Sequence, residues 1–156
     1  MKYYLAYGSN MHVKQMAFRC PSAQVEGIST IEDYELVFRG RYEGAVATIQ
    51  PKEGSSVPVV VWSITPADEE ALDWYEGFPR LYIKQMFEVE LNGDAINAMA
   101  YVMTPGRMYG KPAPSYLRTI STGYETFGFD RRPLALAAKI SAARARGDSC
   151  NSPFKF

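Results

Sequence analysis

The sequence predicts an α+β fold: a small, mixed, mostly antiparallel β-barrel with flanking helices. Segments rich in valine, isoleucine, tyrosine and phenylalanine recur through residues 2–103, whereas helical patterns dominate only after residue 114. Residues 92–94, Asn-Gly-Asp, join two alternating segments and are typical of a tight hairpin turn. One antiparallel group of strands with helices at its edges satisfies both observations.

The first part of the chain is expected to be mostly extended. Residues 2–7 predict a short strand, and a turn at residues 8–10 leads into a helix around residues 12–19 that Pro21 ends. Residues 23–38, 45–49 and 57–64 follow as extended segments, with a turn predicted at residues 51–56, Pro-Lys-Glu-Gly-Ser-Ser. Because residues 57–64 are apolar on both faces, we expect them to form a central strand or one strand of a barrel.

Capping residues define a helix in the middle of the chain. Thr65, Pro66 and Asp68 have the spacing of a helix start, and Gly77 with Pro79 ends the helix after about residue 76. Residues 81–91 and 95–103 then predict a hairpin, and residues 105–114 a loop. Two helices are expected over residues 115–127 and 132–146, the second with an apolar stripe of Leu136, Ile140 and Ala143.

Composition restricts the partners and the location of the protein. The 17 basic and 17 acidic residues cancel, so the molecule carries no net field that gathers nucleic acid or an anionic membrane. The apolar N-terminal run breaks at Gly8, and no apolar stretch approaches the roughly 20 residues of a membrane span. We expect one domain over residues 1–156, in the cytoplasm, with no linker or repeat dividing it.

Metal, nucleotide and nucleophile chemistry find little support in the sequence. Cys20, Cys150 and the single histidine, His12, lack the spacing of a metal site, and glycine-rich nucleotide-binding motifs are absent. Ser9 lies near His12 but lacks the Gly-x-Ser-x-Gly elbow of a serine hydrolase. No motif surrounds Cys20, and His12 is eight residues away on the same expected helix. We therefore expect no metal and no cofactor.

Tyr7-Gly8-Ser9-Asn10 is the first candidate binding element. Unpaired amides at a helix start, next to a glycine that admits a close ligand, suit a carboxylate or a phosphate. The alternative is that Ser9 or Asn10 simply caps the next helix.

Glu76 is the candidate acid/base. It follows Leu72 by four residues, so both side chains face the core if Leu72 does, and it occupies the last helical turn, where the helix dipole disfavours an anion. Partial burial there raises the pKa of a carboxyl toward neutrality, as general acid/base catalysis requires. The alternative is an exposed glutamate at a helix end. Among the 11 tyrosines of the chain, candidates for a pocket wall near Glu76 are Tyr82, Tyr101 and Tyr116.

Two motifs together resemble a known family. Residues 3–11, Tyr-Tyr-Leu-Ala-Tyr-Gly-Ser-Asn-Met, and residues 72–79, Leu-Asp-Trp-Tyr-Glu-Gly-Phe-Pro, resemble the gamma-glutamylcyclotransferase-like superfamily, which includes the AIG2-like proteins. Supporting stretches occur at residues 45–49, 60–65, 100–102 and 114–117, so the resemblance spans about residues 3–130.

The resemblance implies the gamma-glutamylcyclotransferase-like fold and a reaction. In this family the α-amino group of a γ-glutamyl unit attacks its own side-chain amide, which gives 5-oxoproline and a free amine. The resemblance implies that Glu76 is the acid/base and that the amides of Gly8, Ser9 and Asn10 bind the substrate carboxylate. It also places Tyr82 and Tyr101, and Tyr116 less securely, in the pocket. The reaction further requires a donor to the oxyanion, for which Tyr7 and a backbone amide are the candidates.

Three points stay open at the level of sequence. The leaving amine is expected to be read by loops at residues 39–44 and 105–114, with Arg80, Arg107 and Lys111 as candidate contacts for an acidic amine. A non-catalytic ligand-binding member of the family and a γ-glutamyl hydrolase that releases glutamate are the alternative functions. The oligomeric state and the roles of Cys20 and of residues 151–156 have no interpretation.

Overall fold

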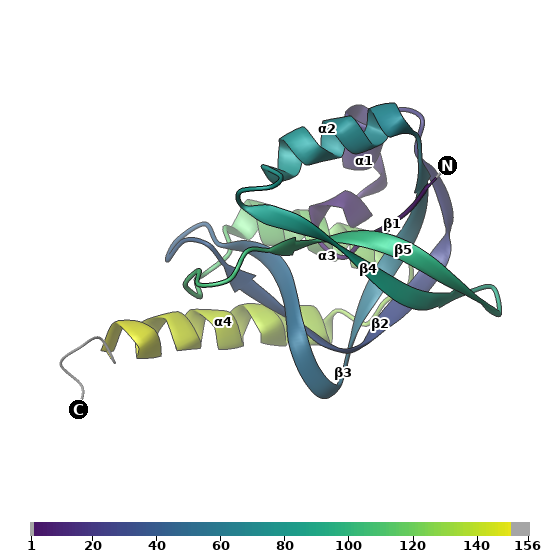
Figure 1. Cartoon of the computed structure of the whole chain (residues 1–156). Coiled ribbons are helices and arrows are strands. Elements are labelled where there is room, and N and C mark those ends of the chain that lie inside the picture. The colour runs from purple at the N-terminus through teal and green to yellow at the C-terminus, as the bar shows by residue number, and fades with distance from the viewer. Residues whose placement is uncertain (1, 151–156) are drawn as a thin grey trace.

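A computed structural model describes the backbone of residues 2–150 and the side chains of residues 2–147. Four helices lie around one sheet (Figure 1). In chain order the elements are β1 (Lys2–Ala6), the 3₁₀ turn η1 (Ser9–Met11), α1 (Val13–Arg19), β2 (Gln24–Arg39), β3 (Val46–Ile64), α2 (Pro66–Glu76), β4 (Tyr82–Leu91), β5 (Asp94–Met103), α3 (Pro114–Thr126) and α4 (Arg132–Cys150). Residues 151–156, for which the sequence offered no interpretation, lie outside the described residues.

The sheet has five strands in the order β2-β3-β1-β5-β4. β1 runs antiparallel to β3 and parallel to β5, and the other neighbours are antiparallel. This mixed, mostly antiparallel sheet with flanking helices confirms the predicted α+β class. Because β1 and β3 are central, the chain enters the middle of the sheet at once, and the turn after Ala6 lies over the core.

The barrel is not closed by backbone pairing, since no ladder joins the edge strands β2 and β4 within the described residues. Side chains bring the two edges together instead. Ser29 Oγ donates to the carbonyl of Glu90 at 2.6 Å, and Gln85 Nε2 donates to the Tyr34 hydroxyl at 3.0 Å. The expected barrel is therefore a strongly curved open sheet whose edges meet through side chains.

The two strands predicted at residues 45–49 and 57–64 form one continuous strand, β3, so the turn predicted at residues 51–56 is wrong. β3 pairs with β2 on both sides of a bulge: Glu32 faces Ser56 and Tyr34 faces Pro51, so residues 52–55 leave the ladder opposite Asp33. Asp33, at φ 62°, accepts from the Gly54 amide with its carboxylate at 3.0 Å. A long partner strand overrides the local turn preference here.

The predicted α2 and hairpin are confirmed. The Thr65 hydroxyl accepts from the Asp68 amide while the Asp68 carboxylate accepts from the Thr65 amide, a complete capping box, and Gly77 ends the helix at φ 67°. Leu91 pairs with Asp94, so Asn92 and Gly93 alone form the hairpin turn, and both have positive φ.

The apolar stripe predicted for α4 faces outward. Leu136 is 57% exposed, Ile140 is 37% exposed and Ala143 is exposed, whereas Leu134, Ser141 and Ala145 are buried. The Ser141 hydroxyl accepts from the Phe38 amide of β2 at 3.0 Å. The helix α4 packs against β2 through the face that carries the small residues Ser141 and Ala145. A pattern based on apolar residues alone does not identify this face.

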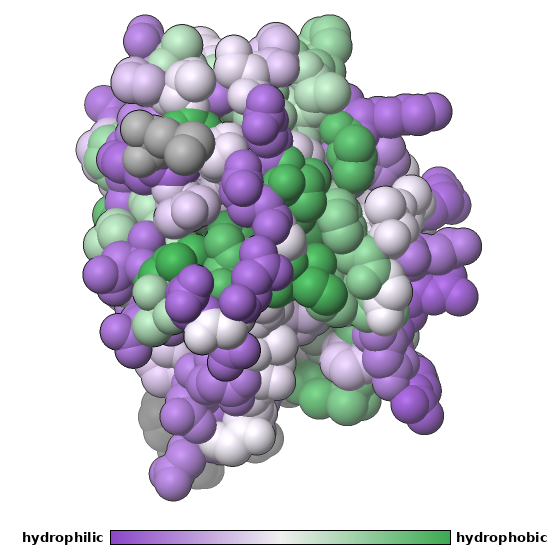
Figure 2. Space-filling view, turned by 90° about the vertical axis from the view of Figure 1, so that its right-hand side faces the viewer, coloured by the Kyte–Doolittle hydropathy of each residue, from purple (hydrophilic) through white to green (hydrophobic). Residues whose placement is uncertain are grey.

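The core lies between the curved sheet and its helices. The Leu5, Val59, Val60 and Val61 side chains are fully buried, in agreement with the prediction of a central strand at residues 57–64. No described helix has the length and apolarity needed to cross a bilayer. On the face in Figure 2, hydrophobic residues gather in the centre and hydrophilic ones surround them.

Candidate active site

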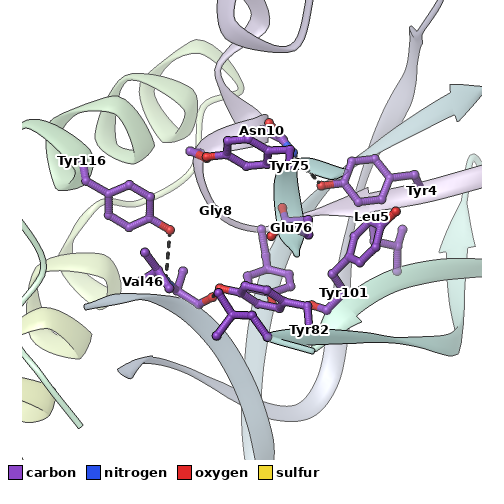
Figure 3. Close-up of a pocket in the computed structure, with 14 residues that line it drawn as sticks. Tyr4, Leu5, Gly8, Asn10, Val46, Tyr75, Glu76, Tyr82, Tyr101 and Tyr116 are labelled. Carbon is purple, nitrogen blue, oxygen red and sulfur yellow. Dashed lines mark hydrogen bonds between the residues drawn. The ribbon is translucent and has the colours of Figure 1, made fainter. Parts of the chain in front are cut away.

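A pocket of about 190 Å³ lies where β1 ends, beneath the last turn of α2 (Figure 3). All the residues that the sequence assigned to the acid/base role and to binding of the γ-glutamyl unit line it, together with residues that the sequence did not single out. The lining residues are Tyr4, Leu5, Tyr7, Gly8, Ser9, Asn10, Val46, Ala47, Tyr75, Glu76, Leu81, Tyr82, Tyr101 and Tyr116.

The Gly8 loop, residues 7–10, forms one wall. The first bond of its 3₁₀ turn runs from the Met11 amide to the Gly8 carbonyl at 3.1 Å, so the preceding amides of Ser9 and Asn10 have no acceptor within the turn. A Cβ on Gly8 would lie 3.4 Å from the Ala47 Cβ and 3.6 Å from the Tyr116 hydroxyl, so this position faces across the pocket. Ser9 and Asn10 are buried. The cap of α1 is His12, which excludes the alternative that Ser9 or Asn10 caps that helix.

Glu76 is the last residue of α2, and its carboxyl is aimed into the pocket (Figure 3). Leu72, one turn earlier, is fully buried, so the predicted inward face of the helix is observed. Burial raises the pKa of the Glu76 carboxyl to about 7, against a smaller lowering by the Arg19 guanidinium. The alternative of an exposed surface glutamate does not hold, and the carboxyl exchanges its proton near neutrality.

The hydroxyl protons of three pocket tyrosines are already committed to protein acceptors. Tyr7 donates to the Tyr101 carbonyl at 2.5 Å, Tyr82 to the Ala47 carbonyl at 2.6 Å, and Tyr101 to the Asp73 carboxylate at 2.5 Å. Burial also raises the pKa of each of these tyrosines, so they are neutral. These three rings form a fixed wall.

The Tyr116 hydroxyl differs from the other three. It accepts from the Ala47 amide at 3.0 Å, so its own proton is left for another acceptor. Figure 3 shows the ring reaching from α3 toward the backbone near Val46, across from the Gly8 loop. Burial raises the pKa of Tyr116, so the hydroxyl keeps its proton at neutral pH.

Tyr4, Tyr75, Val46 and Leu81 also line the pocket. Tyr4 and Tyr75 belong to the two motifs quoted above. Their membership of the same motifs as Gly8 and Glu76 was the sequence signal that could have identified them as pocket residues. Val46 begins a strand and Leu81 follows a loop, and nothing in their local sequence indicates a pocket. The two loops expected to read the amine, residues 39–44 and 105–114, contribute no lining residue, and neither do Arg80, Arg107 and Lys111.

The alternative nucleophiles are not arranged for catalysis. Ser9 Oγ lies 3.2 Å from the Tyr75 hydroxyl, and Nδ1 of His12 accepts from the Gln15 amide at 3.3 Å, so the two do not form a serine–histidine pair. Cys20 is buried, and burial raises the pKa of its thiol to about 11. Within the described part of the chain, no three His, Cys, Asp or Glu side chains gather in a way that could hold a metal ion.

The fold and this pocket define a small enzyme-like α+β domain with one tuned carboxyl opposite a glycine loop. Residues 4–123 match the family described as "Gamma-glutamyl cyclotransferase, AIG2-like". The gamma-glutamylcyclotransferase of Homo sapiens is 30% identical over 150 residues, which cover 89% of this chain and 77% of that protein, and the Mus musculus protein of the same name is 30% identical over 134 residues. The chain belongs to the gamma-glutamyl cyclotransferase family.

Solved structures agree with this assignment. A structure titled "Gamma-glutamyl cyclotransferase" superposes with a TM-score of 0.76 at 28% identity, over 90% of this chain and 86% of that one. A Bacillus subtilis protein, YkqA, superposes with the same TM-score of 0.76 at 18% identity and shows the fold alone.

Proposed function

We propose that this protein is a γ-glutamyl cyclotransferase, which converts a γ-glutamyl amide to 5-oxoproline and a free amine. The α-amino nitrogen attacks the γ-carbonyl carbon of the same molecule, the C–N bond to the amine breaks, and a five-membered lactam remains. The observation that carries the proposal is the half-buried Glu76 carboxyl, with a pKa of about 7, facing the Gly8 loop across a tyrosine-walled pocket. The relatives of this protein that are named gamma-glutamylcyclotransferase support the same cyclotransferase activity.

Glu76 acts as the proton shuttle. In its ionised form the carboxylate takes a proton from the substrate ammonium, which makes the amine nucleophilic. In its protonated form it gives that proton to the leaving nitrogen as the C–N bond breaks. The ring nitrogen then loses its second proton, which the released amine takes up as an ammonium group, so the carboxylate is regenerated without net proton exchange. A pKa of about 7 leaves both forms accessible near neutral pH.

The Gly8 loop holds the substrate's α-carboxylate. The amides of Ser9 and Asn10, without acceptors inside their own turn, together with the amide of Gly8, are the donors we propose for it. Anchoring the carboxylate there bends the γ-glutamyl chain back toward Glu76. Ring closure then gains from proximity, because nucleophile and carbonyl are parts of one bound molecule.

Tyr116 is the donor we propose for the oxyanion that forms on the γ-carbonyl oxygen. The Ala47 amide supplies one hydrogen bond to its oxygen and leaves the hydroxyl proton for the substrate. Tyr7, which was a candidate for this role on sequence, donates its proton to the Tyr101 carbonyl instead. Tyr7, Tyr82 and Tyr101 therefore serve as walls that shape the bound γ-glutamyl unit.

Glu76 is the single ionisable carboxylate among the lining residues, and no Lys, Arg or His is among them. Val46 and Leu81 add an apolar surface. The pocket itself therefore offers no cation to the carboxylate of an amino-acid leaving group.

We keep two further sequence predictions as part of the proposal: one domain over the whole chain, and a cytoplasmic location.

Product analysis tests the proposal. Purified protein is incubated with γ-glutamyl dipeptides and γ-glutamylamines, and products are identified by mass spectrometry. Appearance of 5-oxoproline with stoichiometric free amine is the expected result, and the best substrate identifies the amine. Release of glutamate would establish a hydrolase, and ligand binding without any product would establish a non-catalytic binding protein.

A further inference from the structure

Arg19, the last residue of α1, lies outside the pocket lining but contacts two residues that form it. Its guanidinium carbon lies 3.3 Å from the centre of the Tyr75 ring. Its Nη1 donates to Oδ1 of Asn10. A planar guanidinium can stack on a ring and donate in its own plane at the same time, which an ammonium cannot do.

The contact with Asn10 sets the direction of a short hydrogen-bond chain. Because Oδ1 of Asn10 accepts from Arg19, the amide must present Nδ2 on its other side, where it donates to the Tyr4 hydroxyl at 3.0 Å. The Tyr4 oxygen is then an acceptor of this bond, and its own proton is directed elsewhere. Tyr4 lines the pocket, so this series of hydrogen bonds leaves the proton of the Tyr4 hydroxyl available there.

The contact with Tyr75 joins the Gly8 loop to α2 by a second route. The Tyr75 hydroxyl lies 3.2 Å from Ser9 Oγ, and Tyr75 directly precedes Glu76. Arg19 thus touches the loop through Asn10 and touches the last turn of α2 through Tyr75. The two walls of the pocket, which come from segments more than sixty residues apart, share this one side chain.

Arg19 is also the charged neighbour of Glu76. Within the described residues its guanidinium makes no ion pair with any carboxylate. The other groups that face Glu76 are tyrosine phenols: Tyr4 from β1, Tyr7 from the Gly8 loop, Tyr82 from β4, Tyr116 from α3 and Tyr75 from α2 itself. Burial raises the pKa of Tyr4, Tyr7, Tyr82 and Tyr116, which keeps these four neutral. Arg19 lowers the pKa of Glu76 against the larger effect of burial.

We infer that Arg19 is a positioning residue of this site: it holds the Asn10 side of the Gly8 loop against the Tyr75–Glu76 end of α2 and supplies the positive charge that acts on the Glu76 carboxyl. The geometry of Arg19 is independent of the reaction, while its catalytic consequence rests on the proposed function.

Three variants test this assignment. Arg19→Gln removes the charge and the stacking, Arg19→Lys keeps the charge and loses the planar contact, and Lys14→Gln removes one positive charge from an exposed position on the same helix. Two readouts are taken for each: the pKa of the Glu76 carboxyl by ¹³C NMR titration, and kcat and KM for the best γ-glutamyl substrate across pH.

Arg19→Gln is expected to raise the Glu76 pKa by about one unit and KM by roughly tenfold, because both the charge and the loop contact are lost. In Arg19→Lys the carboxyl pKa should stay near that of the parent protein while KM rises severalfold. Lys14→Gln should match the parent protein in both. A carboxyl pKa and KM unchanged in Arg19→Gln would overturn the inference; should that variant not fold, an unchanged KM in Arg19→Lys would do so.

The two readouts separate this inference from the proposed function. If the parent protein forms no 5-oxoproline from any substrate, the proposed function fails, while a raised Glu76 pKa in Arg19→Gln still supports the charge role of Arg19. If the parent protein turns over substrate and both the titration and KM are unchanged in Arg19→Gln, the function stands and the inference fails.

Discussion

At the scale of single residues, the site depends on how one carboxyl is surrounded. Glu76 sits where the negative end of the α2 dipole meets a wall of neutral phenols, and both disfavour its charge. Arg19 offsets part of this effect. The resulting pKa of about 7 belongs to a group that can accept and return a proton within one turnover.

Replacing Glu76 by Gln should lower kcat by roughly 10³-fold, within the range expected for loss of a general acid/base, and leave ligand affinity nearly unchanged. The amide has the shape of the carboxyl but cannot accept the ammonium proton. Steady-state kinetics and calorimetric binding of 5-oxoproline measure the two effects separately. Parent-like turnover by this variant would contradict the assigned role.

The pH dependence of activity should follow the same group. Only the ionised carboxylate can accept the substrate proton, so kcat/KM should rise with pH, reach half its plateau near pH 7, and stay level until another group titrates. A profile of kcat/KM between pH 5 and 9 checks this. A half-maximum near pH 4.5, the ordinary value for a glutamate, would show that burial does not tune Glu76.

Replacing Gly8 by Val should weaken substrate binding by at least tenfold, because the branched side chain projects toward Ala47 and the Tyr116 hydroxyl. Gly8→Ala is the matched control: its single methyl lies 3.4 Å from the Ala47 Cβ, an ordinary contact distance, so the loss should be much smaller. Dissociation constants for a γ-glutamyl ligand compare the two. Equal affinity of Gly8→Val and the parent protein would remove the Gly8 loop from the binding site.

At the scale of elements, α2 is the part that aims Glu76. The capping box at Thr65 fixes its start, and Gly77 at φ 67° ends it one residue after the carboxyl. Lys84 of β4 binds Glu69 at 2.7 Å and Asp73 at 3.0 Å, and Asp73 also accepts from Tyr101. The helix is thus held at both ends and along the side that faces β4 and β5.

Gly77→Ala should reduce the free energy of unfolding by about 1 kcal/mol, since a side chain at this positive φ is strained. It should also lower kcat, because the strain falls beside Glu76 and Leu81. Gly93→Ala is the control, with φ 88° and open space around its Cβ, at the far hairpin turn. Urea unfolding should show similar losses for both, and kinetics a loss for Gly77→Ala alone; equal kcat in both would contradict the positioning role of this cap.

At the scale of the whole molecule, stability should depend on the ionisation of Glu76. Its folded pKa of about 7 lies above its ordinary value of 4.5, so the folded protein binds more protons than the unfolded chain between these values. The free energy of unfolding contributed by this group is therefore fully present below pH 4.5 and is lost as pH rises through 7. Urea unfolding of parent protein and Glu76→Gln across this range checks it: the free energy of unfolding of the parent minus that of Glu76→Gln should fall as pH rises from 4.5 to 7, and a constant difference would contradict the raised pKa.

Much of the architecture was predictable because local signals were strong. The capping box, the Asn92-Gly93 turn and the apolar run at residues 57–64 each specify one structure with little help from the rest of the fold. The break predicted in β3 and the stripe predicted on α4 were wrong for a shared reason. In both cases a partner element, β2, decides which backbone path and which helix face is used.

The site was predictable only in part. The residue patterns and the two motifs pointed to the Gly8 loop, Glu76 and the tyrosines at positions 82, 101 and 116, all of which line the pocket. Val46 and Leu81 were missed because the curvature of the sheet brings them to the pocket. Which tyrosine keeps a free proton depends on where the Ala47 amide and carbonyl point, and no sequence pattern encodes that.

The most direct test of the central claim is the fate of the γ-carbonyl oxygen when the reaction runs in H₂¹⁸O. Intramolecular attack by the α-amino group incorporates no solvent oxygen, so mass spectrometry should find unlabelled 5-oxoproline and the free amine, both formed roughly 10³-fold more slowly by Glu76→Gln. Glutamate carrying one ¹⁸O, or 5-oxoproline formed equally well by Glu76→Gln, would contradict the account.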